Sequence, residues 1–521
     1  MIPKPPFPWD FDTRSEEVAF EALKARLAGL WGTIFPGDDE PYTSVVVPSL
    51  TLDQDELRKL VGATFYEERL LFLLIRLRNP RARMVYVTSQ PVHPLVLEYY
   101  FQLLAGIPAS HARSHLTLLC AHDASPRPLT QKILERPRLI QRIRAGIIDP
   151  SKAYLTVFNS TPLERRLAVT LDIPLNGLDP RLLHHGTKSG SRRIFLEAGV
   201  PTPPGVEGLR DETDVVDALV EVQRADPQVR RAVVKLDSSF SGEGNAVYTY
   251  PEGDCSRRTV QAGLDRLAFA VPEQTRGPYF EKLARTGGVV EELMEGDGFA
   301  SPSAQLRVNP RGQVILVATH DQILGGPLGQ TYLGCRFPAD TACRGEIQAA
   351  GVRVGQALAA RGVVSRFGVD FVARQRGDRW DVRAIEINLR MGATTHPFLA
   401  LRFLTGGELD VATGEFRAPS GLAKFYRSTD NLCSPAYRGL LPEDLIEILT
   451  VNRLHYDSRS ETGVLFHLIG ALSEFGKVGL TAIGNSREEV ERLYERTLAI
   501  LDRETAVNLP PADRPPARPA V

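Results

Sequence analysis

Residues 367–397 constrain the fold of this chain most strongly. They read FGVDFVARQRGDRWDVRAIEINLRMGATTHP, with apolar residues alternating on both sides of a polar turn at Gly377. Such alternation about a glycine-containing turn predicts a β-hairpin. If the strands pair across that turn, Asp370 faces Glu386 to within a residue, and partners of this kind lie about 5 Å apart. The sequence therefore predicts an antiparallel sheet that carries two carboxylates on one surface.

Two further polar residues extend this carboxylate pair. Asn388 and Arg390 follow Glu386 at two-residue steps, which places all three on one face of a strand. Carboxylate and amide oxygens suit Mg²⁺, which is usually shared with nucleotide phosphates, and a fixed guanidinium suits phosphate oxygens. The alternative is a solvated acidic face. Against it, Glu386 lies in an otherwise apolar strand, where an unpaired carboxylate would be costly to bury.

Length and composition exclude several classes of protein. A chain of 521 residues has room for about two to four domains of roughly 150 residues each. With 62 basic and 63 acidic residues, its net charge of −1 gives no electrostatic case for nucleic acid or a membrane surface. The five scattered cysteines form no CxxC pair, and the N-terminal residues lack an apolar signal core. We therefore expect a cytoplasmic protein.

Strands and helices are expected to alternate over the first third of the chain. Strands are predicted at 44–50, 84–90, 115–120 and 153–159, and helices at 13–30, 67–77 and 95–104. This alternation predicts a parallel α/β sheet. No GxGxxG or P-loop follows these strands, and the later pair Gly476-Lys477 lacks the Ser or Thr that a P-loop requires. The first domain therefore either binds substrate or only supports its neighbour.

Two lysines lie in segments suited to phosphate. Lys188 begins a basic amphipathic helix, where a cation is unfavourable unless an anion lies nearby. Lys235 ends a strand and is followed by SSFSGEGN, whose small residues allow backbone N–H groups to approach an anion closely. A solvated lysine and an ordinary glycine-rich hairpin turn are the alternatives.

An apolar strand within GGVVEELMEGDGF, residues 287–299, meets Glu291 and Glu292. It is either a strand end leaving the core or a purine pocket, in which backbone groups near Met294 face adenine and a carboxylate reaches the ribose. Two strands over 304–324 follow and carry His320. A lone histidine of this kind is more often structural than catalytic.

The final unit, residues 421–505, contains an apolar segment at 467–472 and a strand at 479–484. A capped helix with an apolar stripe follows, and the end of the chain is rich in proline.

Taken in order, these segments resemble the ATP-grasp superfamily of carboxylate–amine ligases. The order is Lys188, Lys235 with its glycine loop, the hinge VVEELM, and then Asp370 with the strand EIN. EINLR also resembles the ExNxR of the biotin carboxylase branch, which makes Arg390 the matching arginine. The strings GTKSGSR, THDQILGGPLGQTYLGCRFPA, EINLRMGATTHP and TGVLFHLIGALSEFGKVGLTAIG are similar to the pheganomycin-type peptide ligases, over most of residues 150–505.

The resemblance implies a mixed α/β protein with α+β character in its ATP-grasp part. A Rossmann-like pre-ATP-grasp domain would span 1–185. An ATP-grasp domain with two antiparallel sheets that clamp ATP would span 186–415. A small α+β C-terminal domain would follow at 416–506, with a disordered proline-rich tail at 507–521.

The resemblance also implies an ATP-dependent ligase of secondary metabolism that works through an acylphosphate and releases ADP and phosphate. Its substrates would be ATP, an amino acid or derivative with a carboxylate, and an amino acid or peptide amine; a homodimer is compatible with it. Asp370, Glu386 and Asn388 would hold Mg²⁺ or Mn²⁺, and Arg390 and Lys235 would be catalytic. The implied ATP contacts are Lys188, Lys235, Ser239, Ser241, Gly242, Gly244, Glu291, Glu292, Leu293 and Met294.

Two positions depart from the superfamily pattern. An arginine that some relatives carry two residues before the first acidic ligand is Gly368 here, which leaves Arg366 or Arg307 as substitutes. The ribose-binding glutamate of simple ATP-grasp ligases aligns with Gly298, which leaves Glu295 or Asp297 as substitutes. Two other functions keep the same nucleotide motifs: an enzyme with a small amine or a phosphoryl acceptor, and a nucleotide-binding protein without turnover. The sequence does not name the substrates or assign roles to His320 and His396.

Overall fold

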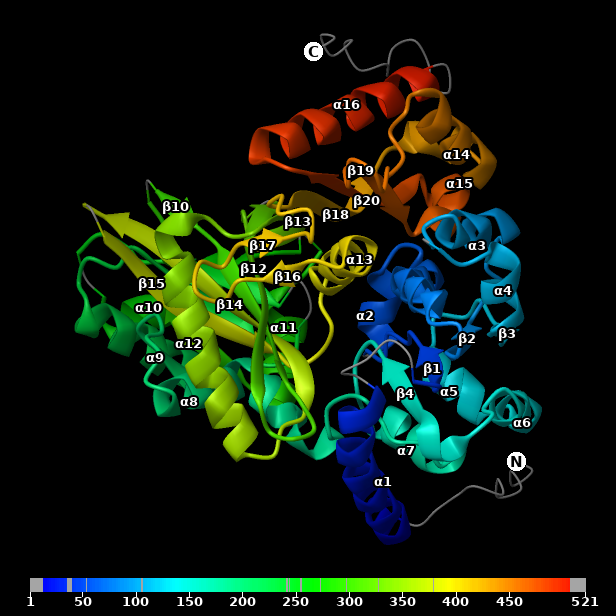
Figure 1. Ribbon diagram of the computed structural model, residues 1–521. Coiled ribbons are helices and arrows are strands. Elements are labelled where there is room, and N and C mark those ends of the chain that lie inside the picture. Colours follow the sequence, from blue (N-terminus) through cyan, green and yellow to red (C-terminus); the bar gives the residue numbers. More distant parts are fainter. Residues whose placement is uncertain are drawn as a thin grey trace.

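The computed structural model describes residues 13–34, 40–52, 54–104, 106–239, 242, 244–253, 255–271, 273–296, 298–326, 328–377 and 379–506. Within these residues three main sheets organise the chain (Figure 1). A parallel sheet forms the N-terminal part, a five-stranded antiparallel sheet follows, and a large antiparallel sheet extends into the C-terminal part. This confirms the predicted mixed α/β class with two antiparallel sheets.

The N-terminal sheet has the strand order β3-β2-β1-β4, and every pairing in it is parallel. The four strands predicted here are therefore confirmed. Their bounds are β1 Thr43–Val47, β2 Arg83–Thr88, β3 Leu116–Cys120 and β4 Ala153–Val157. The α-helices in this part are α1 Thr13–Ile34, α2 Gln54–Lys59, α3 Pro94–Phe101, α4 Ala109–Ser114, α5 Leu129–Leu134, α6 Pro137–Ala145 and α7 Pro162–Leu171, with short 3₁₀ helices η2 Pro150–Lys152 and η3 Pro180–Gly186.

The buried helix predicted at 67–77 is the 3₁₀ helix η1, Ala63–Arg78. A 3₁₀ run of this length is uncommon because its hydrogen bonds are poorly aligned. Tertiary contacts hold it: Glu67 accepts from the Ser89 hydroxyl at 2.6 Å, and Glu68 accepts from the Gly470 N–H at 3.0 Å. The helix is therefore tied to both the N-terminal and the C-terminal parts of the chain.

The five-stranded sheet has the order β5-β9-β6-β7-β8 and is antiparallel throughout. Its strands are β5 Gly205–Leu209, β6 Arg231–Leu236, β7 Asn245–Thr249, β8 Ala268–Phe269 and β9 Gly288–Glu292. The helices of this part are α8 Lys188–Glu197, α9 Glu212–Ala225, α10 Arg257–Gly263, η4 Leu264–Arg266 and α11 Arg276–Thr286. Because β6 ends at Leu236, it carries Lys235 at its end, as predicted.

The large sheet has the order β10-β14-β11-β12-β13-β18-β20-β19, and β15 pairs with β14. Its first strands are β10 Phe299–Ala300, β11 Pro302–Val308, β12 Val314–Gly325, β13 Thr331–Phe337, β14 Ser365–Arg376 and β15 Arg379–Asn388. The predicted hairpin is β14–β15, and its register places Asp370 opposite Glu386. Helices α12 Thr341–Ala360 and α13 Thr395–Thr405 belong to this part, with the small pair β16 Glu408–Leu409 and β17 Phe416–Arg417.

The C-terminal strands continue the large sheet, because β18 pairs antiparallel with β13. The elements are β18 Phe425–Cys433, η5 Pro435–Gly439, α14 Pro442–Val451, β19 Gly463–His467, η6 Ile469–Ala471, α15 Leu472–Phe475, β20 Lys477–Gly484 and α16 Arg487–Thr505. One buried core joins η1, α3 and these strands, for example through Leu74, Val96 and Leu480. The domain boundaries at 185, 415 and 506 stay predictions, and the predicted tail at 507–521 lies outside the described residues.

In the described part of the chain, no helix is long and apolar enough to span a lipid bilayer.

Burial raises the pKa of Glu68 from 4.5 to about 7, although N–H groups of Gly470 and Ile469 oppose the shift. Between these pH values the folded protein binds more protons than the unfolded chain, so stability falls as pH rises. We expect Glu68→Gln to reduce the decrease in the free energy of unfolding with rising pH by at most about 1.4 kcal/mol per pH unit. Burial also raises the pKa of Glu67 to about 7, so part of the dependence of stability on pH should remain in this variant.

Urea unfolding at a series of pH values measures this slope. Glu474→Gln, which changes an exposed glutamate on α15, serves as the control and should keep the slope of the parent. An unchanged slope in Glu68→Gln would show that Glu68 is ionised in the folded protein throughout the range.

Candidate active site

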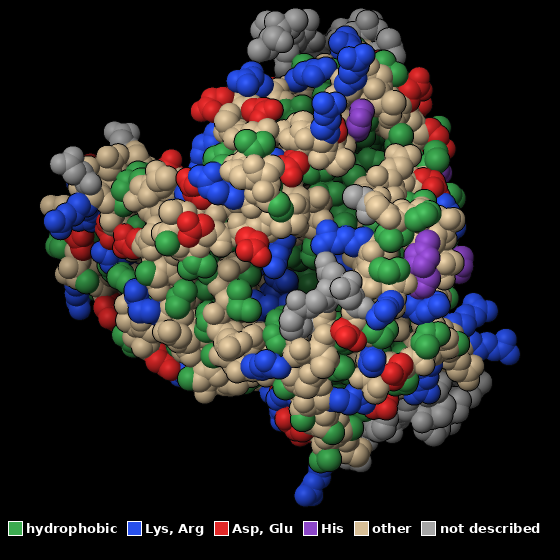
Figure 2. All heavy atoms as spheres, in the orientation of Figure 1, with side chains coloured by type: hydrophobic (Ala, Val, Ile, Leu, Met, Phe, Trp, Pro, Cys, Tyr) green, Lys and Arg blue, Asp and Glu red, His purple; other side chains and the backbone are tan. Residues whose placement is uncertain are grey.

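A cavity of about 530 Å³ lies between the sheets and is lined from β6 and β9 on one side and from β11 to β15 on the other. Residues from η1, β18 and β20 line it as well. Figure 2 shows Lys and Arg side chains around a hollow near the centre of the drawn face. Small-molecule pockets commonly have volumes of about 300–1,000 Å³, so this cavity can hold a nucleotide-sized ligand.

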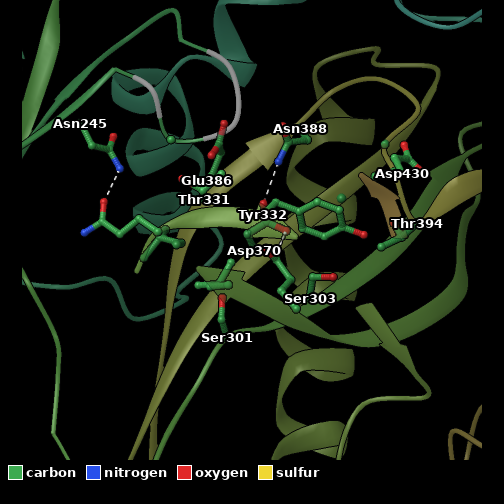
Figure 3. Close-up of a pocket in the computed structure, with 18 of the residues that line it drawn as sticks. Asn245, Ser301, Ser303, Thr331, Tyr332, Asp370, Glu386, Asn388, Thr394 and Asp430 are labelled. Carbon is green, nitrogen blue, oxygen red and sulfur yellow. Dashed lines mark hydrogen bonds between the residues drawn. The ribbon is translucent and has the colours of Figure 1, made fainter. Parts of the chain in front are cut away.

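The paired carboxylates lie in the middle of this cavity. Asp370 Oδ1 accepts from Gln322 Nε2 at 2.8 Å, and its Oδ2 accepts from Asn388 Nδ2 at 2.9 Å (Figure 3). Burial and the negative charge of Glu386 together raise the pKa of Asp370 to about 7, although Arg390 and Lys188 oppose the shift. Lys188 Nζ donates to Glu386 Oε1 at 2.7 Å. Two carboxylates that repel each other this strongly form a site that a cation stabilises.

Asn388 connects the carboxylates to Arg390. Its Oδ1 accepts from Arg390 Nη2 at 3.0 Å, so its nitrogen faces Asp370. The side-chain amide of Asn388 would have to rotate by about 180° to place its oxygen beside Asp370 as a metal ligand. Burial lowers the pKa of Arg390, Glu386 raises it, and the positive charge of Arg69 lowers it. Arg390 is thus a half-buried cation that interacts electrostatically with both the carboxylates and a second guanidinium.

Lys235 is held by a buried counter-ion. Its Nζ pairs with one oxygen of Glu291, and the other oxygen of Glu291 accepts from Arg192 Nη1 at 2.8 Å. Burial raises the pKa of Glu291, but Lys235 and Arg192 outweigh it, so the net shift is downward. Glu291 is 1% exposed and lies outside the cavity lining, whereas its neighbour Glu292 lines the cavity. The buried ionic group therefore orients Lys235.

The glycine-rich loop reaches the large sheet at one end of the cavity. Asn245 Nδ2 donates to Gln330 Oε1 at 2.6 Å (Figure 3). Gly242 has a φ of 80°, and a Cβ there would lie 3.0 Å from the Gln330 carbonyl oxygen. Glycine is therefore required at this approach between the two sheets. Ser239 and Gly244 pack against each other, and a Cβ on Gly244 would lie 2.3 Å from the Ser239 Cβ.

The cavity brings together most of the predicted site residues: Lys188, Lys235, Gly242, Glu292, Leu293, Met294, Asp370, Glu386, Asn388 and Arg390. Ser239, Gly244 and Glu291 are not among its lining residues. Ser241 and Asp297 lie outside the described residues. Glu295 pairs with Arg231 at 2.7 Å. The individual ATP, ribose and metal contacts stay predictions.

The two histidines left open by the sequence are both buried. His320 Nε2 lies 2.5 Å from the Tyr426 hydroxyl, and burial lowers its pKa to about 3. His396 Nε2 lies 3.1 Å from Asp430 Oδ1 and 3.0 Å from His467 Nε2, and burial lowers its pKa to about 4. Neither histidine lines the cavity, but Asp430 does. His396 and His467 therefore position Asp430.

Sequence reasoning missed the other end of the cavity. Arg69 and Tyr66 come from η1, Asp430 from β18 and Lys477 from β20. In Figure 3, Asp430 and Thr394 lie on the opposite side of the carboxylates from Asn245. Lys477 belongs to the Gly-Lys pair that fails as a P-loop, so local pattern gave no reason to include it. Only the fold places these distant segments together.

Comparison with known proteins identifies the family. The model of the family described as "IQCH-like, ATP-grasp" matches residues 181–261 and 274–412. The model of the family described as "PGM1 C-terminal domain" matches residues 444–497. The L-propargylglycine–L-glutamate ligase of Streptantibioticus cattleyicolor is 33% identical over 475 residues, covering 89% of this chain and 95% of that protein. The chain belongs to the ATP-grasp carboxylate–amine ligases. Its predicted likeness to the pheganomycin-type peptide ligases is confirmed.

Two other proteins extend the family comparison. The biotin carboxylase–β,γ-ATP complex from Campylobacter jejuni has the same ATP-grasp fold, with a TM-score of 0.53 and 12% identity over 89% of this chain and 91% of that chain. IQ motif-containing protein H of Danio rerio is 24% identical over 515 residues, which cover 89% of this chain and 48% of that protein. The ligase fold thus extends across nearly all of the chain.

We expect Glu291→Gln to destabilise the protein by about 3–5 kcal/mol, because it leaves Lys235 and Arg192 buried without their counter-ion. ATP affinity should also fall, since Lys235 loses its fixed position. Urea unfolding and nucleotide titration measure the two effects.

Glu415→Gln is the matched control, since Glu415 pairs with Arg417 at 2.6 Å on the surface and its loss should cost less than about 1 kcal/mol. Equal stability of the two variants would contradict the assignment of Glu291 as the central counter-ion.

Proposed function

We propose that this ATP-grasp ligase phosphorylates a substrate carboxylate and then joins the acyl group to an amine. The observation that carries the proposal is the Asp370–Glu386 pair, set between Lys188 and Arg390 within one cavity. Positively charged side chains flank a cation-binding carboxylate pair, which is the arrangement that phosphoryl transfer needs.

The adenine of ATP would lie at the β9 end of the cavity. Leu293 and Met294 line it there, with apolar side chains that include Val233 and Ile385. The triphosphate would extend toward Lys188 and the glycine loop. Gly242 lines the cavity, which supports a role for its backbone N–H in contacting phosphate oxygens.

Asp370, Glu386 and Asn388 would hold Mg²⁺ or Mn²⁺, with Asn388 turned to present its oxygen. The donor set fits, because oxygen ligands suit these hard cations and Glu386 raises the pKa of Asp370. When bound there, the ion would neutralise part of the negative charge of the phosphate groups.

In the first step, a carboxylate oxygen of the acid attacks the γ-phosphorus of ATP, the bond to the β,γ-bridging oxygen breaks, and ADP leaves. In the second, the amine nitrogen attacks the acylphosphate carbon, phosphate leaves, and the nitrogen loses a proton. The products are an amide, ADP and phosphate. Arg390 would stabilise the charge on the transferred group and on the tetrahedral intermediate.

The chain also has to exclude water, which would hydrolyse the acylphosphate. Asn245 and Gln330 connect the glycine loop to the large sheet at one end of the cavity. Residues from η1, β18 and β20 line the other end. We propose that these contacts shield the intermediate until the amine arrives.

Amino-acid substrates are favoured by the relative named as an L-propargylglycine–L-glutamate ligase, in which both named substrates are amino acids. A small amine or a phosphoryl acceptor would use the same nucleotide residues. All five cysteines are free, in keeping with the cytoplasmic location that we propose. Homodimer formation stays a prediction.

Incubation with Mg-ATP and pools of amino acids and short peptides tests the function. We expect ADP and phosphate to form only when an acid and an amine are both present, and mass spectrometry should identify the amide. Glu386→Gln should lower the turnover rate at least about 100-fold, roughly 2.7 kcal/mol of activation free energy.

Glu415→Gln, which changes a surface residue outside the cavity lining, should turn over at the parental rate. AMP and pyrophosphate as products would mean adenylation and would exclude the acylphosphate route. ADP formed with an acid alone, together with a stable phosphorylated acid, would favour the phosphoryl-acceptor alternative.

A further inference from the structure

We propose that the end of the cavity formed by Arg69 and Lys477 binds a second carboxylate of a substrate, one that does not react. This inference rests on the proposed ligase function, because it names a chemical group of that enzyme's substrates. It is carried by two buried cations from segments far apart in the sequence, η1 and β20.

Arg69 is a buried cation with free donors. It is 4% exposed and lines the cavity, and its Nη1 donates to Asp430 Oδ2 at 3.1 Å. Its Nε and Nη2 are buried and have no hydrogen-bond partner among the described residues. Leaving such donors unsatisfied is costly. A guanidinium presents paired N–H groups that match the two oxygens of a carboxylate.

Aromatic rings fix the Arg69 guanidinium in place. Its central carbon lies 4.6 Å from the centre of the Tyr66 ring and 4.3 Å from the centre of the Phe158 ring. Both rings line the same cavity. The guanidinium is therefore held in position before any ligand binds, which reduces the entropy lost on binding.

Lys477 lies close to the same tyrosine. It is 5% exposed, lines the cavity, and donates from Nζ to the Tyr66 hydroxyl at 2.6 Å. An ammonium group has three donors, so this bond leaves capacity for a ligand oxygen. Arg69 and Lys477 thus both contact Tyr66, which brings the two cations to the same end of the cavity, where they can bind one anion together.

The charge balance at this end favours an anion. Arg69 and Lys477 line it as cations, and Asp430 is the carboxylate that lies with them among the described residues. Asp430 already faces Arg69, His396 and His467. Asp430, His396 and His467 lie close enough together to hold a metal ion, but the neighbouring cations would repel it.

This anion position is distinct from that of the reacting carboxylate. Arg390 is held by Asn388 beside Asp370 and Glu386, where phosphate is to be transferred. Arg69 is held instead by Asp430 on β18. The non-reacting carboxylate belongs either to the acid, as in a dicarboxylic amino acid, or to the amine, as in the C-terminus of a peptide.

Calorimetric titration of the full chain with Mg-ADP present separates these sources. One pair of probes is L-glutamate and 4-aminobutyrate, which lacks the α-carboxylate. The other is glycylglycine and glycylglycinamide, which lacks the C-terminal carboxylate. We expect the protein to bind at least one carboxylate-bearing probe about tenfold or more tightly than its match, since charged hydrogen bonds contribute this much. The probe pair whose two members differ in affinity shows whether the acid or the amine supplies the non-reacting carboxylate.

Variants then assign the preference to the two cations. Arg69→Gln and Lys477→Met should each lose the preference for the carboxylate-bearing probe, and Arg69→Lys should keep part of it. Arg459→Gln, which changes an exposed surface residue, should keep the full preference. Unchanged Mg-ADP affinity establishes that each variant is folded. Equal binding within both probe pairs, or full preference retained in Arg69→Gln and Lys477→Met, would overturn the inference. Because binding needs no turnover, these results are independent of whether ADP or AMP is the reaction product.

Discussion

The repulsion between Asp370 and Glu386 is the constraint around which the rest of the site is arranged. The β14–β15 register places these carboxylates opposite each other, and burial strengthens their interaction. Lys188 at the start of α8 supplies one compensating charge, and Arg390 lies close by on the segment that follows β15. The two antiparallel sheets therefore meet at a site whose charges require a cation, phosphate groups or both.

The buried ionic group formed by Lys235, Glu291 and Arg192 has a different role. Lys235 and Arg192 share Glu291 as their counter-ion. Lys235 lines the cavity and is held in position by Glu291, which does not line it. Arg69 is fixed in a comparable way by Asp430, which His396 and His467 hold in turn. In both places a buried carboxylate sets the direction of a cation that can face a ligand. Such preorganisation lowers the cost of ordering side chains during binding.

The parts that followed from local pattern were predictable from the sequence. The alternation around Gly377 gave the hairpin and its register, and the apolar segments of the first third gave the parallel strands. What depends on long-range packing did not follow. The long 3₁₀ form of η1 depends on contacts with Ser89 and Gly470, and the pairing of β18 with β13 joins segments far apart in the sequence. Arg69 and Lys477 meet only because of these contacts.

The most direct test of the central claim follows oxygen from the acid to phosphate. An acid substrate labelled with ¹⁸O in its reacting carboxylate is turned over with Mg-ATP and an amine, and the released phosphate is analysed by mass spectrometry. The acylphosphate account predicts that one labelled oxygen per amide bond appears in inorganic phosphate. Labelled AMP accompanied by unlabelled pyrophosphate would contradict it, because the carboxylate would then have attacked the α-phosphorus.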